Sequence, residues 1–256
     1  MNLLQRIGQE PLIFGHRGVP DETPENTVSS FQKAVELGLD GVELDARLCK
    51  SGELVVFHDD RVDKLPGGSG HVADLSYDDL KRLDAGIRCG ERFRAEKIPL
   101  LEEVLETLSG KMIVNIELKS RSIRDDGLER KVVALVGKMS LQSSVILSSF
   151  NPFSIHRVTK LDPDLKIGLL FSDDQPIHLR KAWATHFFGI DGVHPRYPLV
   201  TAGLIEKARK KNWFVNTWTV DDNALARRLF DAGVAVVITN HPRQMFGALK
   251  THRENP

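Results

Sequence analysis

Short apolar segments alternate with amphipathic segments along almost the whole chain. Nine apolar segments have the length of a β-strand, and they cover residues 12–14, 41–46, 54–59, 112–119, 145–150, 166–171, 190–194, 213–220 and 234–239. Most are separated by stretches with the spacing of an amphipathic helix, such as "LLEEVLETL", "LIEKARKK" and "DDNALARRLFDAG". The first helix of the chain is expected to begin near Pro24, with Thr23 as its cap. This alternation predicts a parallel sheet covered by helices.

The third apolar segment, residues 54–59, does not fit a barrel of eight parallel strands. Only about seven residues separate it from the second segment, and a parallel crossover needs about a dozen or more. We therefore expect this strand to turn back antiparallel. Residues 47–98 then form one insertion, and regular alternation resumes at Pro99. The pattern predicts an α/β fold, a (β/α)₈ TIM barrel of residues 1–46 and 99–256, with a small insertion after the second barrel strand.

Composition narrows the function classes and the expected location. The 256 residues are 41% hydrophobic, and 35 basic residues balance 35 acidic ones, which gives no support to a nucleic-acid or acidic-membrane partner. No window approaches the ~20 apolar residues of a membrane span, and the first residues lack an apolar region of signal-peptide length, so we expect a cytoplasmic protein. Cys49 and Cys89 could form one bridge or remain free thiols, and they are too few for a thiolate metal cluster.

Three of the predicted strands carry polar side chains where buried parallel strands are normally apolar. The residues that share a face are two apart: Glu43 with Asp45, Glu117 with Asn115 and Lys119, and Asn216 with Trp218. Barrel interiors normally hold layers of branched apolar side chains, so charges near strand ends indicate the catalytic mouth. We expect Asn216 and Trp218 to line the substrate cavity there, with Trp218 as an apolar wall.

Three of these side chains, Glu43, Asp45 and Glu117, are acids that would repel one another in a closed site. A hard divalent cation with oxygen ligands, Mg²⁺ or Ca²⁺, would neutralise them. The alternative is that the acids are solvated, or paired with Lys119 and Arg17.

His16 and His58 each end a predicted strand beside charged neighbours. Imidazole pKa values near neutrality suit a general acid and a general base. Together with a metal, Arg17 and Lys119, the two histidines suit a phosphate ester, because cations stabilise the charge that develops on its oxygens. His194 ends another strand and could also reach the mouth.

The motifs "GHRG" (15–18), "PENT" (24–27), "GLDGVELD" (38–45) and "LVVFHD" (54–59) occur in a fixed order, followed by "LDAG" (83–86), "IPLLEEVL" (98–105), "IELK" (116–119), "SSF" (148–150) and "TWTV" (217–220). In this order and spacing the chain resembles the glycerophosphodiester phosphodiesterase family, bacterial cytosolic type. The resemblance extends over nearly the whole chain. It implies the same barrel, with the insertion capping the mouth and supplying His58.

The resemblance also implies an activity: hydrolysis of a small glycerophosphodiester to sn-glycerol 3-phosphate and an alcohol. It implies that the divalent metal is held by Glu43, Asp45 and Glu117, that His16 and His58 form the acid–base pair, and that Arg17 and Lys119 engage phosphate. The glycines around His16 and Arg17 would then allow close approach of the phosphate.

Other functions remain open at this point. A lysophospholipase D-like or sphingomyelinase D-like enzyme would use the same site but needs an apolar groove for acyl chains, whereas the insertion is mostly polar. A non-catalytic binding barrel would have lost a histidine or an acid. We expect no nucleic-acid partner and no membrane span. The alcohol group and the oligomeric state, a homodimer included, are left open.

Overall fold

The first strand closes the barrel. β1 (Leu12–His16) pairs in parallel with both β2 (Gly41–Leu48) and β9 (Val236–Thr239), the first and last strands of the remaining ring. The computed structural model describes residues 2–120, 122–177, 183–186 and 188–254. Between β2 and β9 the ring runs in sequence order through β4 (Ile113–Leu118), β5 (Val145–Ser149), β6 (Lys166–Phe171), β7 (Gly192–Pro195) and β8 (Phe214–Thr217). The result is the predicted (β/α)₈ barrel.

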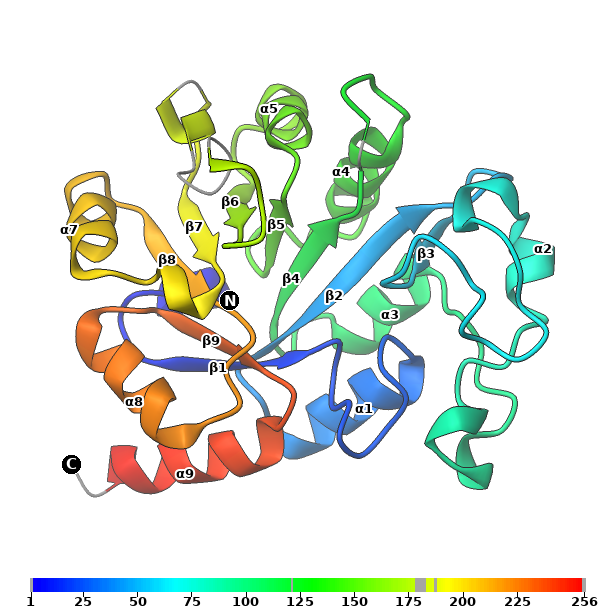
Figure 1. Cartoon of the computed structure of the whole chain (residues 1–256), viewed down its shortest axis with the longest axis horizontal. Coiled ribbons are helices and arrows are strands. Elements are labelled where there is room, and N and C mark those ends of the chain that lie inside the picture. Colours follow the sequence, from blue (N-terminus) through cyan, green and yellow to red (C-terminus); the bar gives the residue numbers. More distant parts are fainter. Residues whose placement is uncertain (1, 121, 178–182, 187, 255–256) are drawn as a thin grey trace.

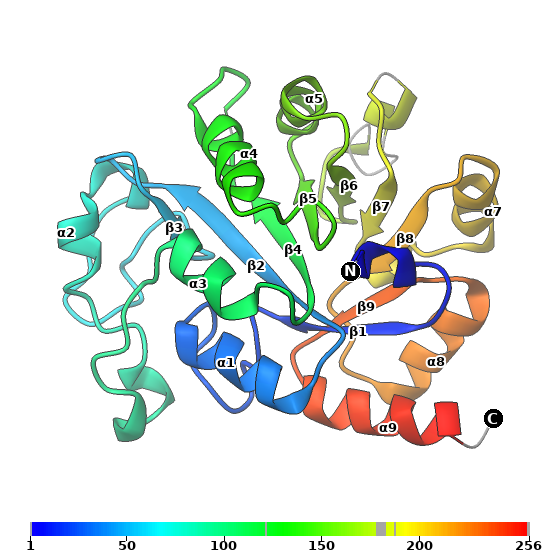
Figure 2. The same cartoon turned by 180° about the vertical axis from the view of Figure 1, so that it is seen from behind.

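The helices lie outside the ring of strands (Figures 1 and 2). They are α1 (Val28–Leu37), α3 (Leu101–Leu108), α4 (Leu128–Lys138), α5 (Pro152–Leu161), α7 (Ala202–Lys210), α8 (Asn223–Ala232) and α9 (Pro242–Glu254). None of the helices in the described parts of the chain combines the length and the apolar character needed to cross a bilayer.

The first helix begins later than predicted. α1 starts at Val28, and its cap is Thr27, whose hydroxyl accepts a hydrogen bond from the Ser30 N–H. Asn26 has a left-handed backbone with a φ of 58°, which a right-handed helix cannot include. The Thr23 hydroxyl, the expected cap, instead donates to the carbonyl of Val19, 2.7 Å away, inside the loop before the helix.

The expected antiparallel strand is present. β3 (Leu54–Val56) pairs antiparallel with β2, with Ala46 opposite Val56. Figure 1 shows β3 and the short helix α2 (Tyr77–Leu80) beside the carboxyl end of β2. This segment has its own small apolar cluster: Cys49, Val55, Val62, Val72, Leu80 and Ile98. Both cysteines are free thiols. The division into a barrel of residues 1–46 and 99–256 and an insertion of residues 47–98 stays a prediction.

The interior of the barrel is apolar at one end and polar at the other. Leu12 and Phe14 share the face of β1 that carries His16, and they belong to a cluster with Ile113, Ile146, Val236 and Ile238. The short 3₁₀ helix at Leu3–Arg6 packs against this cluster from the amino ends of the strands (Figure 2). The apolar cluster therefore fills the end of the barrel at the amino ends of the strands. The polar positions of the same strands lie toward their carboxyl ends.

Candidate active site

The polar strand ends surround a deep cavity of about 240 Å³ at the mouth of the barrel. It is lined by His16, Arg17, Glu43, His58, Asn115, Glu117, Lys119, Phe150, Leu170, Trp218, Thr219 and Ile238. A larger outer cavity of about 840 Å³ shares His58, Glu117, Lys119, Phe150 and Trp218 with it. The site therefore has a small inner chamber and a wide outer one, and most of the predicted site residues line the inner chamber.

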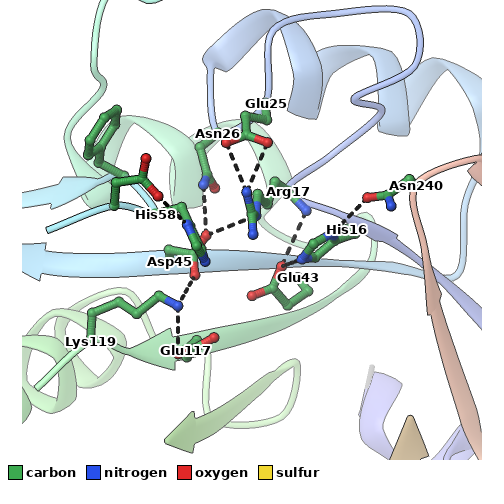
Figure 3. Close-up of polar contacts among 12 residues, drawn as sticks. His16, Arg17, Glu25, Asn26, Glu43, Asp45, His58, Glu117, Lys119 and Asn240 are labelled. Carbon is green, nitrogen blue, oxygen red and sulfur yellow. Dashed lines mark hydrogen bonds and ion pairs between the residues drawn. The ribbon is translucent and has the colours of Figure 1, made fainter. Parts of the chain in front are cut away.

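The three predicted acids come together. Glu43 and Asp45 lie two apart on β2, and Asp45 is in register with Glu117 on β4. One carboxylate oxygen from each residue lies within 4.8 Å of the others, and all three side chains are buried (Figure 3). No cysteine takes part, so the set offers only hard oxygen donors, which Mg²⁺ and Ca²⁺ prefer.

Asp45 is the acid with the most partners. Its carboxylate lies 3.0 Å from Lys119 Nζ and 3.5 Å from Arg17 Nε, and it accepts a 2.8 Å hydrogen bond from the side-chain amide of Asn26. Burial would raise the pKa of Asp45, but the charges of Lys119 and Arg17 outweigh it and hold the pKa well below its usual range. Asp45 is therefore ionised.

Glu43 and Glu117 behave differently. Lys119 Nζ lies 2.7 Å from Glu117, but the nearest partners of Glu43 are the Arg17 backbone N–H at 3.3 Å and His16 Nε2 at 3.9 Å. Burial, followed by the neighbouring Asp45 charge, raises the pKa of Glu43 well above its ordinary value, and burial also raises the pKa of Glu117. The two basic side chains therefore do not neutralise all three acids, and the three residues could hold a divalent metal.

His16 ends β1 and is oriented by a residue from the far end of the chain. Its Nδ1 lies 2.7 Å from Asn240 Oδ1, while the Asn240 amide nitrogen donates to Asp221 at 2.9 Å. Because Asn240 presents its oxygen, the hydrogen of the neutral ring is on Nδ1, and Nε2 is left as a proton acceptor facing the acids. Burial, followed by the charge of Arg17, lowers the pKa of His16. This histidine has the form of a general base.

His58 follows β3 and has a charged partner instead. Its Nδ1 lies 2.8 Å from Asp59 Oδ1, and the other Asp59 oxygen lies 2.7 Å from Lys64 Nζ. The guanidinium of Arg47 donates to the His58 carbonyl at 2.5 Å and so fixes the backbone of this turn. Burial lowers the pKa of His58, although the charge of Asp45 and, to a smaller extent, the hydrogen bond to Asp59 act in the opposite direction. The carboxylate would stabilise an imidazolium at this position.

The turn that carries Arg17 explains the flanking glycines. A Cβ on Gly15 would lie 2.0 Å from the carbonyl oxygen of Gly18, and Gly18 itself has a φ of 95° beside the Ser30 side chain. The glycines therefore make room for the turn's own backbone and for α1. We had expected the glycines to leave space for phosphate, but the atoms that exclude a side chain here belong to the protein itself.

Arg17 and Lys119 are both engaged by carboxylates. Arg17 Nη1 donates to both oxygens of Glu25 at 2.9 Å, in addition to its contact with Asp45. Lys119 bridges Asp45 and Glu117. Both side chains still line the inner chamber, where their remaining N–H groups are available to an anion.

Trp218 lines both chambers, but Asn216 lines neither. The Trp218 indole N–H donates to the His194 carbonyl at 2.9 Å, and its ring meets Phe150 edge to face at a centroid distance of 5.5 Å. Asn216 is fully buried within the barrel, where its amide nitrogen lies 3.2 Å from His194 Nε2. The predicted contact of Asn216 with substrate is not supported by this position, because the side chain lies among the barrel interior residues.

His194 is also inside the barrel and does not reach the mouth. The ring of His194 occupies space beside Gly168 on the neighbouring strand β6, where a larger residue would collide with it. Burial lowers the pKa of His194 to about 3. The unfolded chain has an ordinary histidine pKa of about 6.5 and so binds this proton first as the pH falls. Folding stability is therefore lost between about pH 6.5 and 3.

We expect His194→Gln to reduce this acid sensitivity. At pH 5 the buried neutral ring should cost the wild type about 2 kcal/mol of unfolding free energy relative to neutral pH. Urea unfolding of both proteins at pH 7.5 and pH 5 measures the difference, and the variant should lose less stability on acidification. Parallel losses in the two proteins would contradict a neutral buried His194.

Several residues that position the site were not predicted from the sequence. Asn26 and Asp59 lie within the motifs "PENT" and "LVVFHD", so their sequence context was a usable signal. Asn240 and Arg47 gave no comparable signal. Asn115 was recognised as sharing the face of Glu117, but it was given no role.

The chain is similar to known phosphodiesterases over nearly its full length. The model of the glycerophosphoryl diester phosphodiesterase family matches residues 16–244. A glycerophosphodiester phosphodiesterase of Caldanaerobacter subterraneus is 38% identical over 242 residues, which are 93% of this chain and 98% of that protein. One from Bacillus altitudinis is 34% identical over 237 residues, or 90% of this chain and 94% of that protein.

The comparison with solved structures agrees with the comparison of sequences. A phosphodiesterase of Oleispira antarctica, in complex with the product sn-glycerol-3-phosphate, superposes with a TM-score of 0.82 at 27% identity, covering 98% of this chain and all of that one. A glycerophosphodiester phosphodiesterase of Thermotoga maritima superposes with a TM-score of 0.74 at 27% identity, covering 93% of this chain and 98% of that one.

Proposed function

Since the chain belongs to the glycerophosphoryl diester phosphodiesterase family, we propose that the inner chamber hydrolyses glycerophosphodiesters to sn-glycerol 3-phosphate and an alcohol with His16 and His58 as the acid–base pair. The chain is an enzyme of this class. The observation that carries the residue assignment is that two buried carboxylates, Glu43 and Glu117, line one chamber with both histidines. The third acid, Asp45, lies within 4.8 Å of these two carboxylates.

In this proposal Glu43, Asp45 and Glu117 would hold the metal, which would be Mg²⁺ or Ca²⁺. When bound, it supplies Lewis-acid stabilisation of the charge on the phosphate oxygens. The ammonium of Lys119 contacts both Asp45 and Glu117, and it would turn to a phosphate oxygen if a metal neutralised these acids. Arg17 contributes a guanidinium whose fork geometry suits phosphate.

The two histidines differ in their partners, and this supports different roles. His16 is held by a neutral amide, so it stays neutral and accepts a proton from the nucleophile, water or the glycerol 2-hydroxyl. His58 is held by the Asp59 carboxylate and lines both chambers. The oxygen of the nucleophile forms a bond to phosphorus as the bond from phosphorus to the alcohol oxygen breaks, and His58 donates its proton to that departing oxygen.

The chamber sizes suggest where each half of the substrate lies. The inner chamber of about 240 Å³ is smaller than typical pockets for drug-sized ligands, which measure ~300–1,000 Å³, and it suits glycerol phosphate. Phe150, Leu170 and Trp218 give it an apolar side on which the glycerol carbons can pack. The outer chamber of about 840 Å³ then receives the variable alcohol.

The outer chamber argues against an acyl chain as part of that alcohol. Its lining includes Arg47, Asp59, Asp60 and Asp174, and these charged groups would lose hydration against a hydrocarbon tail. This favours water-soluble diesters over the lysophospholipase D-like alternative. Cytoplasmic location and assembly as a homodimer stay predictions.

A substrate screen tests the proposed function. We expect hydrolysis of glycerophosphocholine, glycerophosphoethanolamine and glycerophosphoglycerol, each releasing sn-glycerol 3-phosphate, and much slower hydrolysis of lysophosphatidylcholine. Enzyme-coupled detection of glycerol 3-phosphate measures the first product directly. Faster turnover of the lysophospholipid, or release of a product other than sn-glycerol 3-phosphate, would contradict the proposal.

A further inference from the structure

Asn115 is a buried amide with unused hydrogen-bonding capacity inside the active site. It lies on β4, two residues before Glu117 on the same face, and is in register with Glu43 of β2. Its side chain is 1% exposed and lines the inner chamber. Neither its nitrogen nor its oxygen has a hydrogen-bond partner among the residues that the structure describes.

A buried amide without hydrogen-bond partners destabilises the fold, so its presence in a chamber suggests that a ligand supplies the partners. Leaving a buried donor or acceptor unsatisfied costs about 1–3 kcal/mol, and most buried polar groups in proteins are paired. Asn240 follows the rule, because its oxygen accepts from His16 and its nitrogen donates to Asp221. Asn26 is satisfied in part, because its nitrogen donates to Asp45 and only its oxygen lacks a partner. At Asn115 the amide nitrogen and the amide oxygen are both open to a ligand that enters the chamber.

The chemistry of the amide limits what that ligand is. A phosphate oxygen can accept from the Asn115 nitrogen but cannot donate to its oxygen, and a metal ion can engage only the oxygen. A hydroxyl group can do both at once. The apolar side of the same chamber, formed by Phe150, Leu170 and Trp218, suits the carbons of a short polyol.

We propose that Asn115 binds a hydroxyl group of the glycerol moiety and makes the enzyme specific for glycerol on this side of the phosphate. This inference rests on the proposed function, because it takes the inner chamber to be the glycerol side. A site built to bond a hydroxyl rejects an analogue that lacks it, since the buried polar group of the protein is then left unpaired. Asn115 would thus set substrate choice without taking part in proton transfer.

The test removes the proposed hydrogen bond in two ways, by deleting the hydroxyl from the substrate and by replacing Asn115 in the protein. Substrates are glycerophosphocholine and its two deoxy analogues, one lacking the 2-hydroxyl and one lacking the terminal hydroxyl. The variant is Asn115→Leu, which has a similar volume and no polar group. In the wild type we expect kcat/KM to fall about 10- to 100-fold for one analogue, equivalent to one or two hydrogen bonds. In Asn115→Leu the full substrate should lose a similar factor, and that analogue should lose little further.

Two further measurements separate this role from others. Calorimetric titration should show weaker binding of sn-glycerol 3-phosphate to Asn115→Leu, with unchanged affinity for Mg²⁺ and Ca²⁺. The melting temperature of the ligand-free variant should be equal to or above that of the wild type, because an unpaired buried amide has been removed. Ser148→Ala is the matched control: it removes another buried, unpartnered polar atom, on β5 beside Glu117, that does not line the inner chamber.

The outcomes are distinct. Equal discrimination between substrate and both analogues in the wild type and Asn115→Leu would overturn the inference, because the amide would then hold water or serve only packing. Loss of metal affinity in the variant would also overturn it and make Asn115 a metal ligand. If the wild type hydrolyses the diesters but neither hydroxyl matters, only this inference fails. If the wild type hydrolyses no glycerophosphodiester and does not bind sn-glycerol 3-phosphate, both it and the proposed function fail.

Discussion

Replacing either His16 or His58 by alanine should lower kcat by about 10²–10⁴-fold, the range that general acid–base catalysis contributes. His16 ends β1 and His58 lies in the turn after β3, both at the mouth, so the loss of either imidazole should leave the barrel folded. The double variant should lose less than the product of the two single losses, because groups that act as a unit are not additive. Steady-state kinetics on glycerophosphocholine measures the effect, with far-UV circular dichroism as the check on folding.

His71→Ala provides the matched control, since His71 is an exposed histidine in the segment after β3. It should leave kcat unchanged. The two site variants should also differ from each other. A substrate with a good leaving group, such as a nitrophenyl diester, needs little help from an acid, so it should restore activity to His58→Ala more than to His16→Ala. Near-normal kcat in both alanine variants on every diester tested would contradict the assignment of this site.

Removing the divalent metal should abolish turnover, and Glu43→Gln should weaken metal binding without harming the fold. Glu43 is the acid least satisfied by Arg17 and Lys119, so replacing it by a neutral amide relieves repulsion in the metal-free protein. Loss of partners that only support a ligand typically costs 10–100-fold in metal affinity, and loss of the ligand itself should cost at least that much. Calorimetric titration with Mg²⁺ and Ca²⁺ measures it and distinguishes the two ions.

Thermal unfolding supplies an independent readout of the same prediction. Saturating metal should raise the melting temperature of the wild type but not of Glu43→Gln, because a ligand stabilises the state that binds it. Asp164→Asn, at an exposed position before β6, should behave as the wild type. Full activity after exhaustive chelation, or undiminished metal affinity in Glu43→Gln, would contradict the role given to the three acids.

The barrel and the cluster of acids could be predicted because both depend on local periodicity. Strands and helices repeat at regular spacing, and the short link before β3 excludes a parallel crossover, so the antiparallel turn followed from chain length alone. Glu43 and Asp45 share a face because side chains two apart on a strand point the same way, and Glu117 joins them because β2 and β4 are parallel neighbours in the ring. Apart from the pairing of these two strands, which the barrel order supplies, these inferences need no knowledge of which distant segments meet.

Contacts between distant segments could not be predicted in the same way. Asn240 is 224 residues from His16, and no sequence pattern near either residue indicates that they pair. The start of α1 was misplaced for a related reason. Thr23 and Thr27 are both acceptable caps in sequence, but the left-handed Asn26 and its bond to Asp45 place the loop before Val28. Asn216 was assigned to the cavity because it shares a face with Trp218, yet its depth in the barrel depends on the register of the whole ring.

The bond between His16 and Asn240 also has a consequence for synthesis of the protein. β1 is synthesised well before β9 and Asn240, so a nascent chain contains all three acids and both histidines before His16 has its orienting partner. A chain that still lacks Asn240 has no oxygen at this place to accept from Nδ1 of His16. The orientation of His16 is therefore completed only after β9 and Asn240 have been made and the ring has closed.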